Sequence, residues 1–101
     1  MTTNLARVPA IPVVYEEVVV GATAVGFAAL PTTGQLVRTT VQTDSGPINF
    51  RLDGVAPTAS VGAAAFNGDK LEFDRNEATR FLAIRQGVTN GVLRVHHYVR
   101  A

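Results

Sequence analysis

Apolar and polar residues alternate along several short segments of this chain, other segments are rich in β-branched residues, and turn-forming residues separate them at short intervals. An alternation with a period of two places one row of side chains on each face of a β-strand. No stretch of about ten residues follows the period of an amphipathic helix. We therefore expect strands over residues 13–20, 35–43, 48–52, 70–73, 80–85 and 92–100.

The segments between these strands are rich in glycine, proline, asparagine and aspartate, which favour turns. Residues 21–30 are small and apolar, and they fit either a further strand or a packed loop. Residues 55–66 are small and extended, and residues 74–79 form a polar link with at most one helical turn. The pattern predicts an all-β fold, a small antiparallel β-sandwich or barrel of about seven to eight strands.

The first twelve residues carry Pro9 and Pro12, which fix φ and remove backbone donors. We expect an extended N-terminal arm over residues 1–12 and a single β domain over residues 13–101. Arg7, Pro9 and Pro12 are candidate contact residues, because a proline-bearing extended segment has little core to join. The alternative for the first six residues is a frayed terminus.

The last predicted hairpin joins residues 80–85 to residues 92–100 through Asn90-Gly91. Pairing Ile84 with Leu93 and Leu82 with Val95 would unite one apolar face. The residues that we expect to be buried are Phe50, Leu52, Phe73, Leu82, Ile84, Leu93 and Val95.

The same register leaves a polar face with four further candidates beside Arg85. From Ala78 to Ala101 the chain has four arginines and no acidic residue. The candidate interface residues on this face are Arg85, Arg94, His96, Tyr98 and Arg100. The face fits a docking surface for an acidic partner, and a solvated sheet face is the alternative.

Candidate chemistry is sparse. His96 and His97 are adjacent, so a strand would point their imidazoles to opposite faces, whereas a metal needs convergent ligands. The acidic residues between Asp69 and Glu77 lack the spacing of a calcium loop, and we expect them to be solvated. No phosphate-binding or nucleophile motif is present. We therefore expect no catalytic residue, no cofactor and no metal, and a protein that is not an enzyme.

Composition narrows the possible partners. Hydrophobic residues make up 47% of the chain and charged residues only 17%, so a core is available while the surface is poor in charge. The formal net charge of +1 gives no global attraction to nucleic acid or membrane. The absence of cysteine excludes disulfides and thiolate metal sites. A domain of this size must rest on its core or on assembly with other subunits.

The second half of the chain resembles a group of small virion proteins of tailed bacteriophages. The residues that carry the resemblance lie between Val41 and Tyr98, and they are Ile48-x-Phe50-x-Leu52-Asp53-Gly54, Ala56-Pro57-Thr58-Ala59-Ser60-x-Gly62, Gly68-Asp69, Arg80-Phe81-x-Ala83-Ile84 and Gly91-Val92-Leu93-x-Val95-x-His97-Tyr98. These turns and inward apolar positions form a fold signature. The resemblance implies a structural component of the phage head or neck.

We accordingly expect a capsid decoration (cement) protein that stabilises the head shell by protein-protein contacts. Its expected partners are the major capsid protein or other virion proteins and copies of itself, in a virion assembled in the host bacterial cytoplasm. A neck or tail-tube component near the portal is the first alternative. A nucleic-acid-binding β module that uses the arginines on phosphates is the second, although the near-neutral charge argues against it.

Overall fold

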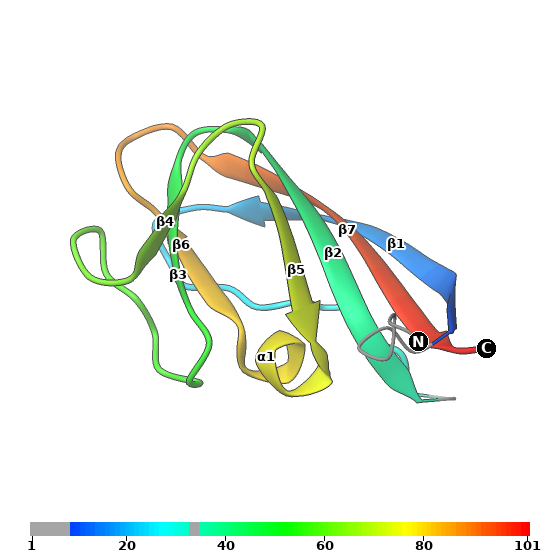
Figure 1. The fold of residues 1–101 in the computed structure, drawn as a ribbon. Helices are drawn as coiled ribbons and strands as arrows, with labels where there is room; N and C mark the ends of the chain where they lie inside the picture. Colours follow the sequence, from blue (N-terminus) through cyan, green and yellow to red (C-terminus); the bar gives the residue numbers. More distant parts are fainter. Residues whose placement is uncertain (1–8, 33–34) are drawn as a thin grey trace, which may run out of the picture.

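The computed structural model describes residues 9–32 and 35–101, and within them seven strands form two antiparallel sheets (Figure 1). Sheet A has the strand order β1-β7-β2-β5, and sheet B has the order β4-β3-β6. The bounds are β1 Ala10–Val20, β2 Leu36–Ser45, β3 Ile48–Arg51, β4 Ala63–Ala65, β5 Lys70–Asp74, α1 Arg75–Arg80, β6 Leu82–Arg85 and β7 Gly91–Arg100. The prediction of a small all-β sandwich is confirmed.

The chain passes from sheet A to sheet B at a tight turn between β2 and β3. Ser45 has a φ of 65°, and the amide of Gly46 donates to the carbonyl of Asn90 at 3.0 Å. A Cβ atom on Gly46 would lie 2.3 Å from the carbonyl oxygen of Thr89, so only glycine fits here. The predicted turn at residues 44–47 therefore also anchors the loop that precedes β7.

Four phenylalanines form the centre of the core between the two sheets. The rings of Phe27 and Phe81 are stacked with centroids 4.4 Å apart, and Phe81 lies 5.3 Å from Phe73 and 5.8 Å from Phe50. Aromatic pairs at these separations add to the stabilisation that apolar burial provides. The cluster joins β3, β5 and the start of β6 to the segment after β1.

The predicted core is correct for four residues and wrong for β6. Phe50, Phe73, Leu93 and Val95 are buried, whereas Leu52, Leu82 and Ile84 are only partly buried. On β6 the inward residues are Phe81, just before the strand, and Ala83. A shift of one residue reverses the faces of a strand, and here the larger phenylalanine ring takes the core position.

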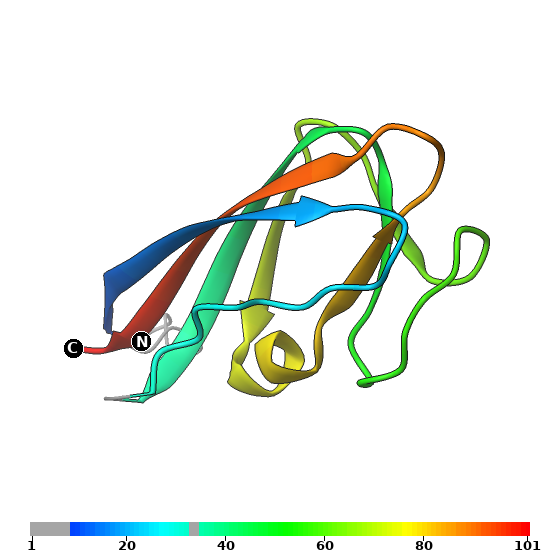
Figure 2. The same cartoon turned by 180° about the vertical axis from the view of Figure 1, so that it is seen from behind.

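The segment after β1 is a packed loop rather than a regular strand. A single bridge pairs Val25 with Ala83 of β6, and the amides of Ala28 and Ala29 donate to the carboxylate of Glu16 at 3.1 and 3.0 Å. Figure 2 shows this segment running along the side of the sandwich between β1 and β6. It closes that side of the core.

The expected arm of residues 1–12 overlaps strand β1. Ala10, Ile11 and Pro12 pair with Arg100, Val99 and Tyr98 of β7, so these residues belong to the domain. The register shifts between Pro12 and Val14, which is typical of a β-bulge at an edge strand. Proline is tolerated there because one side of an edge strand has no partner strand. Residues 1–8, with Arg7, lie outside the described residues.

The polar link before β6 contains the single helix of the described residues, α1. Asp74 caps its N-terminus by accepting from the amide of Glu77 at 2.8 Å, and the Glu77 carboxylate accepts from the amide of Asp74 at 2.9 Å. This reciprocal capping box satisfies two free backbone donors. Two of the acidic residues predicted to be solvated therefore stabilise a helix start.

Candidate interaction surface

The outer face of sheet A collects polar side chains from all four of its strands. On β7 the outward residues are Arg94, His96, Tyr98 and Arg100, and the inward residues Leu93, Val95, His97 and Val99 are buried. The predicted alternation along this strand is confirmed. We call the outward side of β1, β7, β2 and β5 the outer face.

The predicted pairing of the last hairpin is wrong. β6 pairs with β3 in sheet B, whereas β7 pairs with β1 and β2 in sheet A, so the connection at residues 86–90 passes between the sheets. Arg85 therefore does not join the outer face, and its guanidinium donates to the Asn90 side chain at 2.7 Å. Long strands β1 and β2 take both sides of β7 because each offers many more pairing positions than β6.

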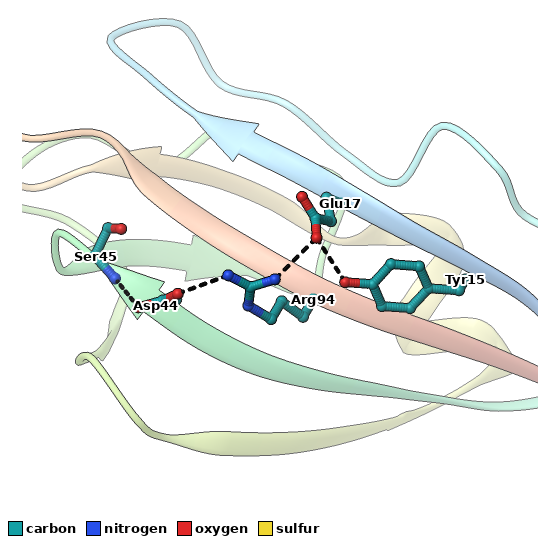
Figure 3. Close-up of polar contacts among 5 residues, drawn as sticks. All are labelled: Tyr15, Glu17, Asp44, Ser45 and Arg94. Carbon is teal, nitrogen blue, oxygen red and sulfur yellow. Dashed lines mark hydrogen bonds and ion pairs between the residues drawn. The ribbon is translucent and has the colours of Figure 1, made fainter.

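Arg94 lies at the centre of the outer face between two carboxylates (Figure 3). Its guanidinium donates to Glu17 of β1 and to Asp44 of β2, each at 2.9 Å. All three side chains are exposed to solvent, so the two ion pairs contribute little to stability. The two ion pairs fix the position of the guanidinium. They also compensate the positive charge of Arg94, which has no acidic partner when the sequence of β7 is considered by itself.

Aromatic side chains flank Arg94 along the same face. The rings of Tyr15 and His96 are 5.0 Å apart, and the Tyr15 hydroxyl donates to Glu17 at 2.8 Å. Further along, the guanidinium carbon of Arg38 lies 4.8 Å from the centre of the Tyr98 ring. A cation over an aromatic face is an attractive contact. Each aromatic side chain thus has a neighbour that restricts its orientation.

A shallow hollow of about 450 Å³ lies on this face, and Tyr15, Arg94 and His96 form one side of it. The remaining lining residues are Thr40, Val41, Gln42, Lys70, Leu71 and Glu72 from β2 and β5. The hollow therefore spans all four strands of sheet A. Its walls mix aromatic, cationic and anionic groups.

Three residues of the outer face, Tyr15, Glu17 and Asp44, are not among the predicted site residues. They come from strands far from β7 in the sequence, so spacing within the last hairpin could not indicate them. One signal was available. Glu16 and Glu17 are adjacent in the middle of an apolar strand, so one must face the core and the other must face solvent.

The inward partner, Glu16, belongs to a buried polar network. The His97 Nε2 atom lies 2.6 Å from a Glu16 carboxylate oxygen, and the His97 Nδ1 atom lies 2.7 Å from the Thr39 hydroxyl. Since a carboxylate can only accept, Nε2 carries a proton. Two backbone amides of the packed loop also donate to the Glu16 carboxylate, which thus accepts three hydrogen bonds.

This network has the connectivity of a hydrolytic triad, hydroxyl to imidazole to carboxylate. Thr39 and His97 have no exposed surface, so no substrate can reach the hydroxyl. The network instead satisfies buried polar groups and ties β1, β2 and β7 to the loop. His96 and His97 point to opposite sides of sheet A, and the described residues contain no cluster of three or more potential metal ligands.

Comparisons with protein-family models, curated proteins and solved structures found no match for this chain. No helix among the described residues is long and apolar enough to cross a membrane. The remaining predicted contact residues within the described chain lie together at one end of sheet A, where β1 begins and β7 ends. Pro12 lies on β1 opposite Tyr98, Arg100 is exposed at the end of β7, and Pro9 accepts a backbone hydrogen bond from Ala101.

The ion pairs of Arg94 give a prediction on titration. The hydrogen bond from Arg94 lowers the pKa of Asp44 below its ordinary value, so this interaction stabilises the fold above the unfolded-state pKa and is lost as the pH falls through the folded-state pKa. Arg94→Ala should raise the pKa of Asp44 toward the ordinary value, as measured by carbon-13 NMR of the carboxyl groups. Asp53, whose pKa is held at about 2 by Arg51, is the internal control and should not move. An unchanged Asp44 titration in the variant would contradict this arrangement.

Proposed function

We propose that this chain is a structural protein of a tailed-phage virion, a capsid decoration protein that stabilises the head shell by protein-protein contacts through its outer face. One observation carries the proposal. Arginine and aromatic side chains are held in fixed positions across a four-stranded sheet, around a shallow hollow. The resemblance of residues 41–98 to small virion proteins supports the same conclusion.

The residue types on the outer face suit protein recognition. Tyrosine and arginine are enriched among the residues that dominate binding energy at protein interfaces. Side chains that are already ordered lose less conformational entropy on binding. Tyr15, Arg94 and Tyr98 each have an intramolecular contact that orders them. The face therefore supplies rigid anchors for a partner surface.

The charges on the outer face favour a partner surface that carries both signs of charge rather than a partner surface that is mainly acidic. Arg94 is shared by Glu17 and Asp44, so a phosphate or a third carboxylate would have to displace both. Lys70 and Glu72 alternate along β5 beside the hollow. A nucleic acid needs unpaired cations that release counterions from phosphates, and the central arginine does not offer one. A folded protein surface fits this pattern best.

The test is incorporation of a variant into phage particles. Combining Arg94→Ala with Tyr98→Ala should reduce the number of copies per particle by at least about tenfold, because interface anchors contribute about 2 kcal/mol or more each. The melting temperature of the free protein should change little, because the pairs that are lost lie at the surface. Arg80→Ala on α1 is the matched control and should be incorporated normally.

Normal incorporation of the double variant would show that the outer face is only a solvated face of the sheet. Loss of incorporation by the Arg80→Ala control as well would also count against the proposal, since it would trace the defect to arginine content rather than to this face.

A further inference from the structure

The two sheets of the described chain end in four edge strands, and these edges differ in length and charge. In sheet A the edges are β1 and β5, and in sheet B they are β4 and β6. β4 has three residues, and β6 has four and meets the bridge at Val25. β5 has five residues, of which Lys70, Glu72 and Asp74 are charged and exposed. Short strands and exposed charges are the usual protections against edge-to-edge pairing.

β1 has Pro12 and the bulge between Pro12 and Val14 as protections near its start, but from Val14 to Val20 it has neither a proline nor a bulge. It has eleven residues and pairs with β7 on one side only. On its other side, no backbone hydrogen bond joins it to another part of the described chain. It contains no lysine or arginine, and its acids are engaged: Glu16 by His97 and the loop amides, and Glu17 by Arg94 and Tyr15.

Large apolar side chains on β1 are exposed to solvent. Ile11, Val13, Tyr15 and Val19 each have about half or more of their surface exposed, the largest fraction being 59% at Val19. Tyr15 and Val19 lie on the outer face, whereas Ile11 lies opposite the inward Val99. Exposed apolar side chains therefore follow the outer side of the strand, whereas Val18 and Val20 on its inner side are buried. An edge with exposed apolar side chains is a template for another strand.

We propose that a second copy of this chain pairs its own β1 antiparallel to this edge, so that two four-stranded sheets become one continuous sheet. Among the four edge strands described, only another β1 has equal length and matching apolar side chains. A head-to-tail contact with β5 would place Val13, Tyr15 and Val19 against charged side chains. A two-fold contact buries like against like and closes at two copies.

Charge permits this pairing. The outward carboxylate of Glu17 is compensated by Arg94 within its own copy, so the edge does not repel an identical edge. Edge pairing extends sheet A in its own plane and leaves the outer face of both copies open. The inference therefore goes beyond the proposed function, and its test changes Val19 rather than Arg94 or Tyr98.

Sedimentation equilibrium of the purified full chain tests the proposal. The wild-type protein should sediment at about twice its mass of 10.7 kDa. Val19→Lys places a charge on the free edge of each copy and should raise the dissociation constant at least about tenfold. Val88→Lys is the matched control, since Val88 is 90% exposed in the loop before β7, and it should leave the dimer intact.

The proposal would be overturned by a wild-type protein that is monomeric up to about 100 µM, a concentration at which a functional dimer would be populated. It would also be overturned by a Val19→Lys variant that is as dimeric as the wild type. A Val88→Lys control that dissociates as much as Val19→Lys would be the third contradicting result. Circular dichroism of each variant confirms that the fold is retained. Failure here leaves the particle test of the outer face unaffected, because that test reads incorporation through Arg94 and Tyr98.

Discussion

Replacing Phe81 by alanine is expected to lower the free energy of unfolding by about 3–5 kcal/mol. The ring is almost fully buried and contacts Phe27, Phe50 and Phe73, so its removal opens a cavity where the two sheets meet. A domain of this size typically has a stability of about 5–15 kcal/mol, so the variant loses a large part of it. Urea denaturation followed by circular dichroism measures the loss.

The adjacent variant Leu82→Ala is the control for the orientation of β6. Leu82 is only partly buried, and it points to the opposite side of sheet B from Phe81 and Ala83. Its truncation should cost clearly less than that of Phe81, because fewer contacts and a smaller cavity are involved. If Leu82→Ala were the more damaging of the two, the orientation of β6 described above would be incorrect.

Replacing His97 by alanine is expected to destabilise the fold by about 3–5 kcal/mol, because it takes a donor from a largely buried carboxylate and removes a fully buried ring that packs edge-on against Phe27. The substitution removes the imidazole donor from the Glu16 carboxylate, whose side chain is about one-tenth exposed. It also leaves the buried Thr39 hydroxyl without its partner. The packed loop at Ala28 and Ala29 should then lose hydrogen-exchange protection along with the global stability.

His96→Ala is the matched control for His97. His96 occupies the next position on β7 but lies exposed on the outer face, where it contacts only the Tyr15 ring among the aromatic residues. Its loss should cost about 1 kcal/mol or less. Equal destabilisation by the two histidine variants would mean that the buried network does not support the fold.

The alternation of apolar and polar residues predicted most of the strands, because period two is a local property of the chain. It predicted β1, β2, β3, β5 and β7 within a few residues of their observed bounds. It also predicted β6, but not which of its faces is buried, because Phe81-Leu82-Ala83-Ile84 is apolar at every position. Such a run does not indicate which side chains point inward. That depends on which of them fit the aromatic cluster, whose other rings come from distant parts of the chain.

The pairing of strands was beyond the reach of local pattern. Asn90-Gly91 resembles a hairpin turn, yet β6 and β7 lie in different sheets, because β1 and β2 compete for both sides of β7. The same long-range pairing explains the outer face. The sequence indicated Arg94 as an outward residue of β7. Its partners Glu17 and Asp44 come close to it only because β1 and β2 pair with β7.

The outer face and the free edge of β1 together describe a subunit suited to assembly. The outer face presents ordered arginine and aromatic side chains to a partner, and the edge offers backbone groups to an identical strand. The buried network at His97 lies beneath both surfaces and holds β1 to the packed loop. The fold thus uses this buried hydrogen-bond network to keep the edge strand in position.

The number of copies of this chain in purified phage particles, measured by quantitative mass spectrometry, is the most direct test of the proposed function. A decoration protein repeats with the symmetry of the shell, so the proposal predicts hundreds of copies per particle, on the order of the number of shell subunits. About a dozen copies or fewer would instead indicate a neck or tail component built on a ring. Complete absence from the particles would contradict any role in the virion.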